Sequence, residues 1–361
     1  MKVAVIGGGP AGSTAAYYLS KEADVTIYDA RPVIGTPIQC SGLFSEKIHD
    51  IVRIPKSLQV NRIRGTRIIG PNGKSVRIMF KSRNILVNRD AFDTFLLERA
   101  LDNGAQARTS ARFTHTKERT VYFKTPTGTS RQQTDLLVGA DGPNSRTRTL
   151  SNLTAHRANL MGIQATVRCD HDNLIEFFPH IGAYAWLIPQ DKETARIGVA
   201  AMPSNARTVF ESFISRFKGI RIDMQAGMIP LYHPRVRNEG NTGRIKTMLV
   251  GDAASQLKNT TGGGIIPAML CARRLSESAL RGDNYEKAWR AEVGASLWLH
   301  YKAHQAFQRF SEPDWNSLIS DCDTKTVRGA LGRENRDDIM RLLAKLVLRK
   351  PSLLRYATKA L

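Results

Sequence analysis

The sequence is poor in cysteine and in acidic residues, and each shortage excludes a class of protein. Its 361 residues include four cysteines, none of them in a C-x-x-C pair. This argues against a disulfide framework or a zinc site and fits a reducing compartment. Asp and Glu number 32 against 53 Lys and Arg, so the formal net charge is +21. Such an excess favours an anionic partner, which could be a nucleic acid, an acidic lipid surface or a phosphorylated substrate.

Long hydrophobic runs and nucleic-acid motifs are missing as well. No apolar run approaches the roughly 18 residues that a membrane span needs, and the first strand pattern starts so early that no signal peptide is expected. There is no RRM, KH or zinc-finger pattern and no aromatic–basic stripe, so we expect no nucleic-acid partner. The eight scattered histidines show no metal-ligand spacing. We therefore expect a metal-free cytoplasmic protein, either soluble or peripheral on a membrane.

A glycine-rich turn near the N-terminus is the clearest motif. An apolar run, Val3–Ile6, leads into Gly7, Gly9 and Gly12 at G-x-G-x-x-G spacing, and a small-residue helix follows to Leu19. In this strand–turn–helix context the glycines permit the turn, the approach of a pyrophosphate and close helix packing. A second strand ends at Asp29, whose carboxylate suits a ribose hydroxyl. The pattern predicts a dinucleotide site on a helix N-terminus.

Two later segments repeat the combination of a buried strand and an acidic turn. One apolar strand delivers Asp141-Gly142, and another, Met248–Gly251, delivers Asp252. The second is followed by Thr261–Gly264, a glycine run that opens a helix and places backbone N–H groups near a polar ligand edge. Between them, residues 160–235 read mostly as strands. We therefore expect a dinucleotide domain assembled from separated pieces around an inserted sheet.

Together these segments resemble the FAD-dependent fold of p-hydroxybenzoate hydroxylase and, within it, the geranylgeranyl reductase family, over about residues 1–290. The resemblance implies an α/β fold with a Rossmann-like FAD domain (1–60, 85–155 and 243–285), an inserted, mostly antiparallel substrate sheet (61–84 and 156–242) and a helical C-terminal region (286–361). It assigns FAD contacts to Gly7, Gly9, Pro10, Ala11, Gly12, Asp29, Ala30, Cys40, Ser41, Gly42, Arg89, Asp141, Gly142, Gly251, Asp252, Gly262, Gly263, Gly264 and Ile265.

Two motifs favour the reductases over the hydroxylases. Pro37–Gly42 (PIQCSG) resembles the reductases' P-x-x-C-G/S-G loop beside the flavin. Tyr184–Pro189 (YAWLIP) is similar to their Y-x-W-x-F-P lipid-site signature, although Ile188 replaces the aromatic residue before the proline. The resemblance implies catalytic roles for Cys40, as an acid–base group, and for Tyr184 and Trp186, which alternate on a strand and so face one side. Core packing explains the same three residues equally well.

The resemblance also implies the substrate and partners: isoprenoid ether phospholipids of archaeal type, and an external electron donor, NAD(P)H or ferredoxin. The C-terminal stretch 337–361 combines an apolar face with recurring Arg and Lys. It fits either a helix packed on the protein body or an anchor on the inner face of the cell membrane. A flavin monooxygenase or halogenase, and an electron-transfer flavoprotein without catalysis, remain as alternatives.

Overall fold

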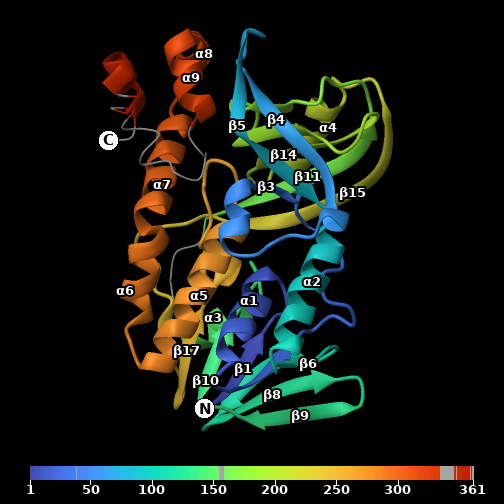
Figure 1. Cartoon of the computed structure of the whole chain (residues 1–361), viewed down its shortest axis with the longest axis vertical. Helices are drawn as coiled ribbons and strands as arrows, with labels where there is room; N and C mark the ends of the chain where they lie inside the picture. The colour runs from blue at the N-terminus through green and yellow to red at the C-terminus, as the bar shows by residue number, and fades with distance from the viewer. Residues whose placement is uncertain (38, 154–157, 334–344, 347, 358, 360–361) are drawn as a thin grey trace.

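The computed structural model describes residues 1–37, 39–153, 158–333, 345–346, 348–357 and 359. Figure 1 shows two layered parts, one around the N-terminal strands and one around a large curled sheet, with C-terminal helices along one side. Nearly half of the stretch 337–361, including most of its predicted amphipathic helix, lies outside the described residues, so its two alternative roles stay predictions. None of the described helices is long and apolar enough to cross a membrane.

A six-stranded sheet forms the base, in the order β16-β17-β10-β1-β2-β6. Five strands run parallel and β16 is the antiparallel edge. The strands are β1 (Lys2–Ile6), β2 (Asp24–Tyr28), β6 (Gln106–Arg108), β10 (Leu136–Gly139), β16 (Glu239–Thr242) and β17 (Ile245–Leu249). Strands from three distant parts of the sequence are thus neighbours, as the predicted Rossmann-like fold requires.

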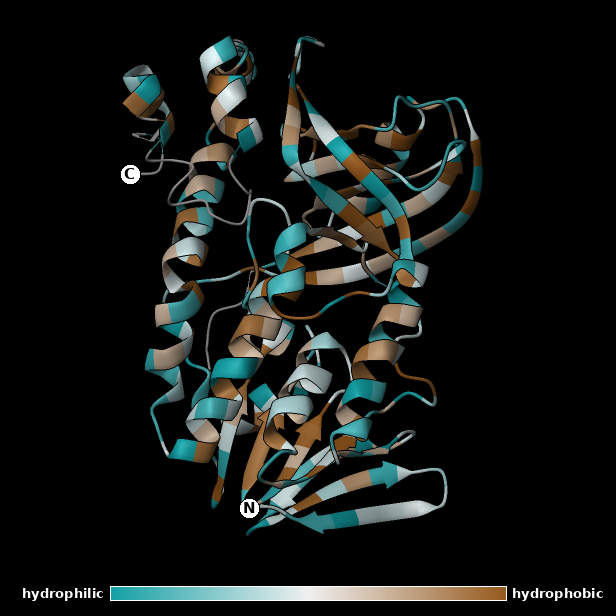
Figure 2. Cartoon of the chain, viewed as in Figure 1, coloured by the Kyte–Doolittle hydropathy of each residue, from teal (hydrophilic) through white to brown (hydrophobic). Residues whose placement is uncertain are grey.

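Both faces of this sheet are covered, which explains its continuous apolar strands. On one face, Val3 and Val5 pack against α1 (Pro10–Leu19) and α5 (Ile265–Arg281). On the other face, Ala4 and Ile6 pack against a three-stranded antiparallel sheet. That small sheet contains β7 (Arg112–Lys117), β8 (Thr120–Thr125) and β9 (Gly128–Gln133). The strand β9 has too few apolar residues to be recognised from the sequence. Figure 2 shows the base strands as the hydrophobic centre of this part.

The second sheet has eight strands, ordered β15-β11-β14-β13-β12-β4-β5-β3, and all pairs except β12–β4 are antiparallel. Its strands are β3 (Leu43–Ser45), β4 (Gln59–Ile69), β5 (Ser75–Val87), β11 (Asn159–Arg168), β12 (Ile175–Phe178), β13 (Tyr184–Pro189), β14 (Thr194–Ala201) and β15 (Ile220–Pro230). The helix α4 (Ala206–Ile214) packs through Phe210 and Phe213 on one face. The opposite face is left for the site.

Helices and short turns complete the chain. The remaining elements are η1 (Glu46–Asp50), η2 (Lys56–Leu58), α2 (Arg89–Asp102), α3 (Arg146–Ser151), η3 (Gly251–Ala254), α6 (Tyr285–Trp289), the π-turn η4 (Arg290–Gly294), α7 (Ala295–Gln308), α8 (Glu312–Cys322), α9 (Lys325–Arg333), η5 (Pro351–Leu353) and α11 (Leu354–Ala357). The described residues that follow α5 are mostly helical, as predicted. The α9 helix packs closely on β5, since a Cβ at Gly332 would lie 2.2 Å from the Met79 carbonyl oxygen.

Candidate active site

The two sheets meet at a cavity of about 920 Å³, at the upper end of the size range of small-molecule and cofactor sites. It begins at the carboxyl ends of β1, β2 and β10 and continues along the face of the large sheet opposite α4. The predicted cofactor residues line it with two exceptions, Gly12 and Gly42. The predicted catalytic residues Cys40, Tyr184 and Trp186 line it as well.

Three glycines of the N-terminal turn are explained by three different structural constraints. Gly7 has φ +100°, and a Cβ there would lie 2.3 Å from the Ala140 carbonyl oxygen. A Cβ on Gly12 would lie 1.9 Å from the Gly7 carbonyl oxygen, so Gly12 serves packing and does not face the cavity. A Cβ on Gly9, by contrast, meets no protein atom within 4 Å. Gly9 lines the cavity at the N-terminus of α1, where free N–H groups and the helix dipole favour an anion such as pyrophosphate.

Asp29 closes the other side of this turn. Its carboxylate accepts hydrogen bonds from the backbone N–H of Gly8 at 2.9 Å and from Arg31 Nε at 3.1 Å. Burial alone would raise the pKa of Asp29, but these hydrogen bonds bring it below its ordinary value. The carboxylate is therefore charged and fixed at the end of β2, as a ribose hydroxyl acceptor requires.

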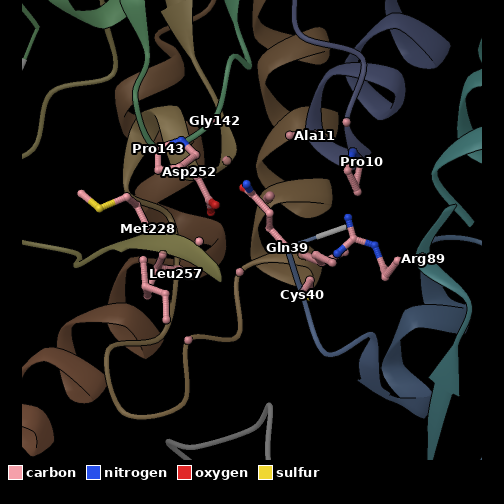
Figure 3. Close-up of a pocket in the computed structure, with 18 of the residues that line it drawn as sticks. Pro10, Ala11, Gln39, Cys40, Arg89, Gly142, Pro143, Met228, Asp252 and Leu257 are labelled. Carbon is pink, nitrogen blue, oxygen red and sulfur yellow. The ribbon is translucent and has the colours of Figure 1, made fainter. Parts of the chain in front are cut away.

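The other two predicted acidic residues, Asp141 and Asp252, have different hydrogen-bonding environments. The carboxylate of Asp141 accepts hydrogen bonds from Ser145 and from the backbone N–H of Thr147 at 2.9 Å, and so holds the start of α3. It shapes the loop, and Gly142 beside it presents its backbone to the cavity. The Asp252 carboxylate faces the cavity (Figure 3), and no described residue donates a hydrogen bond to it. Burial raises the pKa of Asp252 to about 6.

This shift predicts a pH-dependent stability of the flavin-free protein. Between the ordinary Asp pKa of 3.8 and about 6, folded Asp252 keeps a proton that the unfolded chain has released. Stability should therefore fall as the pH rises from 4 to 6, by up to about 3 kcal/mol, and Asp252→Asn should abolish that fall. Urea unfolding of both proteins at pH 4.5, 5.5 and 7 measures it. Parallel pH profiles of the two proteins would contradict the assignment.

Cys40 lies beside two buried arginines. Arg89, from α2, hydrogen-bonds Cys40 and pairs with Asp93 at 2.9 Å, and Figure 3 shows it reaching toward Gln39 and Cys40. Arg196, from β14, donates to the Ser41 carbonyl oxygen. The second arginine ties the large sheet to the loop that carries Cys40. Arg196 belongs to none of the sequence motifs above, although a lone arginine inside the apolar strand TARIGVAA is a visible signal.

Tyr184 and Trp186 lie side by side on the cavity face of β13, with ring centroids 6.0 Å apart. Trp186 Nε1 donates to Gln164 on β11 at 3.3 Å. The Tyr184 hydroxyl is buried without a hydrogen-bond partner in the described part of the chain, and burial raises its pKa. Phe177, Ile188 and Ile229 extend the apolar wall. This end of the cavity suits a hydrocarbon chain.

The residues present fit FAD. Gly9 leaves open space where phosphates meet a helix N-terminus, and the carboxylate of Asp252 has no hydrogen-bond donor among the described residues. The cavity continues beyond both residues to the large sheet. The N-terminus of α5, at Gly264 and Ile265, lies on the same cavity wall and offers backbone N–H groups to the polar edge of a flavin. The described residues contain no cluster of His, Cys, Asp and Glu that could hold a metal ion.

Comparison with known proteins supports the assignment of an FAD-binding fold. Residues 5–50 match the model of an NAD(P)-binding Rossmann-like domain. A geranylgeranyl bacteriochlorophyll reductase-like protein from Thermoplasma acidophilum has the same fold, with a TM-score of 0.81 and 19% identity over 100% of this chain and 99% of that one. A flavin-dependent brominase follows at a TM-score of 0.69 and 17% identity, over 99% of this chain and 98% of the other. The fold is thus that of flavin-dependent oxidoreductases, and the residues of the site fit FAD.

Curated relatives indicate which kind of oxidoreductase the chain resembles. The chain is 25% identical to digeranylgeranylglycerophospholipid reductase 2 of Methanopyrus kandleri over 98% of both chains. It is 29% identical to digeranylgeranylglycerophospholipid reductase 2 of Methanothermobacter thermautotrophicus, over 90% of this chain and 92% of the relative. The predicted resemblance to geranylgeranyl reductases is confirmed. It also extends beyond the predicted limit near residue 290 into the C-terminal helices.

Proposed function

We propose that this protein is an FAD-dependent reductase that saturates C=C bonds in the geranylgeranyl chains of isoprenoid ether phospholipids. One observation carries the proposal: the cavity that fits FAD continues directly into the apolar wall of Phe177, Tyr184 and Trp186. The names of the full-length relatives support the lipid substrate. The domain division and the site roles predicted from the sequence are part of this proposal.

An isolated alkene is a poor electrophile, so the protein must hold it and keep water away. When bound, reduced FAD supplies the hydride that one alkene carbon accepts. The other carbon needs a proton, and we assign this step to the Cys40 thiol, which lines the cavity between the Arg89 side and the large sheet. Tyr184 and Trp186 hold the chain by apolar contact, and Arg196 fixes the loop of Cys40 through Ser41.

The decisive experiment is anaerobic. We expect the chemically reduced holoprotein, mixed with a digeranylgeranylglycerophospholipid, to add two hydrogens per double bond while its flavin is reoxidised, as followed by mass spectrometry and absorbance.

Cys40→Ala should retain the flavin but reduce the alkene at least about 100-fold more slowly, since general acid catalysis contributes 10²–10⁴-fold. Full activity of that variant would remove Cys40 from the mechanism.

An unchanged lipid would overturn the proposal. Oxygen consumption coupled to NAD(P)H oxidation would then favour a monooxygenase or halogenase, whose fold is shared. Parallel assays with NADPH and with reduced ferredoxin identify the external donor. The net charge of +21 supports peripheral contact with the anionic inner face of the cell membrane. Salt-sensitive binding to anionic vesicles measures that contact.

A further inference from the structure

The large sheet presents two glutamine amides to the cavity. Gln164 on β11 pairs with Gln225 on β15 and, on its other side, with Gly198 on β14. Gly198 pairs in turn with Trp186 on β13. These residues form one row across the sheet, and the side chains of Trp186, Gln164 and Gln225 all line the cavity. The row therefore brings two neutral polar groups to the wall beside the indole.

Gly198 explains how this row fits together. A Cβ at Gly198 would lie 2.5 Å from Cζ2 of Trp186 and 2.6 Å from Cβ of Gln164, so the absence of a side chain lets the indole lie across β14. The indole Nε1 then donates to Gln164 Oε1 at 3.3 Å. Because its carbonyl oxygen is engaged there, Gln164 has its NH₂ group left to donate to another acceptor.

Each glutamine keeps one buried atom without a protein partner. Gln164 is only 5% exposed, and among the described residues neither its Nε2 nor the Oε1 of Gln225 has a hydrogen-bond partner. Leaving such groups unpaired is costly. One atom is a donor and the other an acceptor, on opposite positions of neighbouring strands. A single water satisfies both, and ordered waters typically bind at such groups.

The loop that carries Cys40 lies on this part of the sheet. Gln39 packs on Gly227, where a Cβ would lie 3.1 Å from Gln39 Cβ. Gly227 follows Gln225 by two positions on β15 and so lies on the same face. Figure 3 shows Gln39 and Cys40 together in the cavity. The residue before Cys40 is thus placed next to the glutamine row.

The residue after Cys40 is anchored on the other side of the row. The Ser41 carbonyl oxygen accepts a hydrogen bond from Arg196. Arg196 precedes Gly198 by two positions on β14, and so its side chain lies on the cavity face. Because Gln39 and Ser41 contact the sheet on the two sides of the glutamine row, Cys40 lies beside that row.

The proposed reaction needs a route for protons to this thiol. Each reduced double bond takes one proton from Cys40 and leaves a thiolate, and a lipid with several double bonds requires a new proton for each. The alkene must nevertheless be kept away from bulk water. The strand β15 is the edge of the large sheet, and Ile220–Met224, directly before Gln225, are exposed. The glutamine pair therefore lies close to solvent at the sheet edge.

We propose that Gln164 and Gln225 hold an ordered water that returns a proton to the Cys40 thiolate after each reduction. This role rests on the proposed function, because it resupplies the acid of that same reaction. The S–H bond of Cys40 breaks as the alkene carbon takes its proton, and the thiolate then takes a proton from the water. The water regains a proton from solvent, so each double bond consumes one solvent proton. Both glutamines are positioning residues, because they act through the water.

The first turnover and the later ones test this role separately. Reduced holoprotein and the digeranylgeranylglycerophospholipid are followed through one reoxidation of the flavin, and then with excess dithionite. In Gln225→Leu the first double bond should be reduced at the wild-type rate, because Cys40 starts protonated. Later turnovers should be at least about 10-fold slower, since a water that loses one of two partners is bound more weakly by roughly that factor. They should slow further in D₂O, because proton resupply then limits the rate.

Two further variants serve as controls. Gln225→Glu should keep most of the wild-type rate in later turnovers, because a carboxylate oxygen also accepts from the water. Gln133→Leu, at an exposed glutamine on β9 away from the cavity, should leave all turnovers unchanged. Gln164→Leu should show the same split as Gln225→Leu, but it also leaves the Trp186 N–H unpaired, so Gln225 is the cleaner test.

Equal rates of Gln225→Leu and wild type in every turnover would overturn the role of the water and leave the reductase proposal intact. A first turnover slowed as much as the later ones would also overturn it, since Gln225 would then contact the lipid itself. Failure of wild type to reduce the lipid would instead overturn the reductase proposal.

Discussion

Gly9→Val should fold like wild type and lose FAD. The substitution adds atoms where a Cβ meets no protein atom within 4 Å, and Gly9 has φ −69°, which valine adopts. The new methyl groups project into the cavity at the N-terminus of α1 and displace the phosphates from its N–H groups. Because two or more charge-assisted hydrogen bonds of about 1.5–3 kcal/mol each are lost, FAD affinity should fall at least about 100-fold. Flavin titration followed by fluorescence measures it.

The thermal midpoint of the flavin-free variant should match that of flavin-free wild type, which separates lost binding from lost folding. Gly329→Ala is the control, because Gly329 also has nothing within 4 Å but lies in α9, away from the cavity. It should keep FAD and gain about 0.5–1 kcal/mol of stability. Retention of wild-type flavin affinity by Gly9→Val would place the pyrophosphate elsewhere.

Of the substitutions proposed for this protein, Arg89→Leu should lower the free energy of unfolding the most. The Arg89 and Asp93 side chains are 11% and 6% exposed and form an ion pair at 2.9 Å. Removing the arginine leaves a buried carboxylate without its partner, which typically costs about 3–5 kcal/mol. The free energy of unfolding, from urea titration of the flavin-free protein, measures this loss. FAD binding should also weaken, because Arg89 lines the cavity and hydrogen-bonds Cys40.

The double variant Arg89→Leu/Asp93→Leu separates these two effects. With both charges gone, no buried group is left unpaired, and replacing a whole buried pair by apolar residues is often close to neutral. Stability should therefore recover most of the loss, while FAD affinity stays low. Recovery of both would show that Arg89 only supports the fold. A single variant as stable as wild type would show that the pair contributes nothing to folding.

Local signals identified residues that the structure gathers around one end of the cavity. The turn around Gly7 and Gly9, the strand ending at Asp29 and the strand ending at Gly251 each carry their pattern within a few residues. Such patterns are recognisable because a glycine turn between a strand and a helix constrains the backbone within a few residues. The structure brings these segments together at the carboxyl ends of the parallel strands.

The substrate half could be predicted only in part. Tyr184 and Trp186 were recognised by motif. The strand β15, which supplies Met228 and Ile229 to the wall, alternates apolar and polar residues only in its first half, where the apolar side chains are exposed. The side chains of Thr260 and His300 lie 2.6 Å apart although the two residues are 40 positions apart in the sequence, and only tertiary packing joins them. Pairings of this kind depend on tertiary contacts, which periodicity does not encode.

The order of the base sheet has a consequence for synthesis of the chain. A nascent chain that has emerged as far as β15 already holds β1, β2, β6 and β10, yet the outer edge of β10 has no neighbour until β17 arrives. An open apolar edge can pair with another chain, and such late, distant contacts slow folding. The sheet that the first residues begin is therefore completed only by the last third of the protein. Because β17 spans residues 245–249 of 361, about 70% of the chain must be synthesised before the flavin site can form.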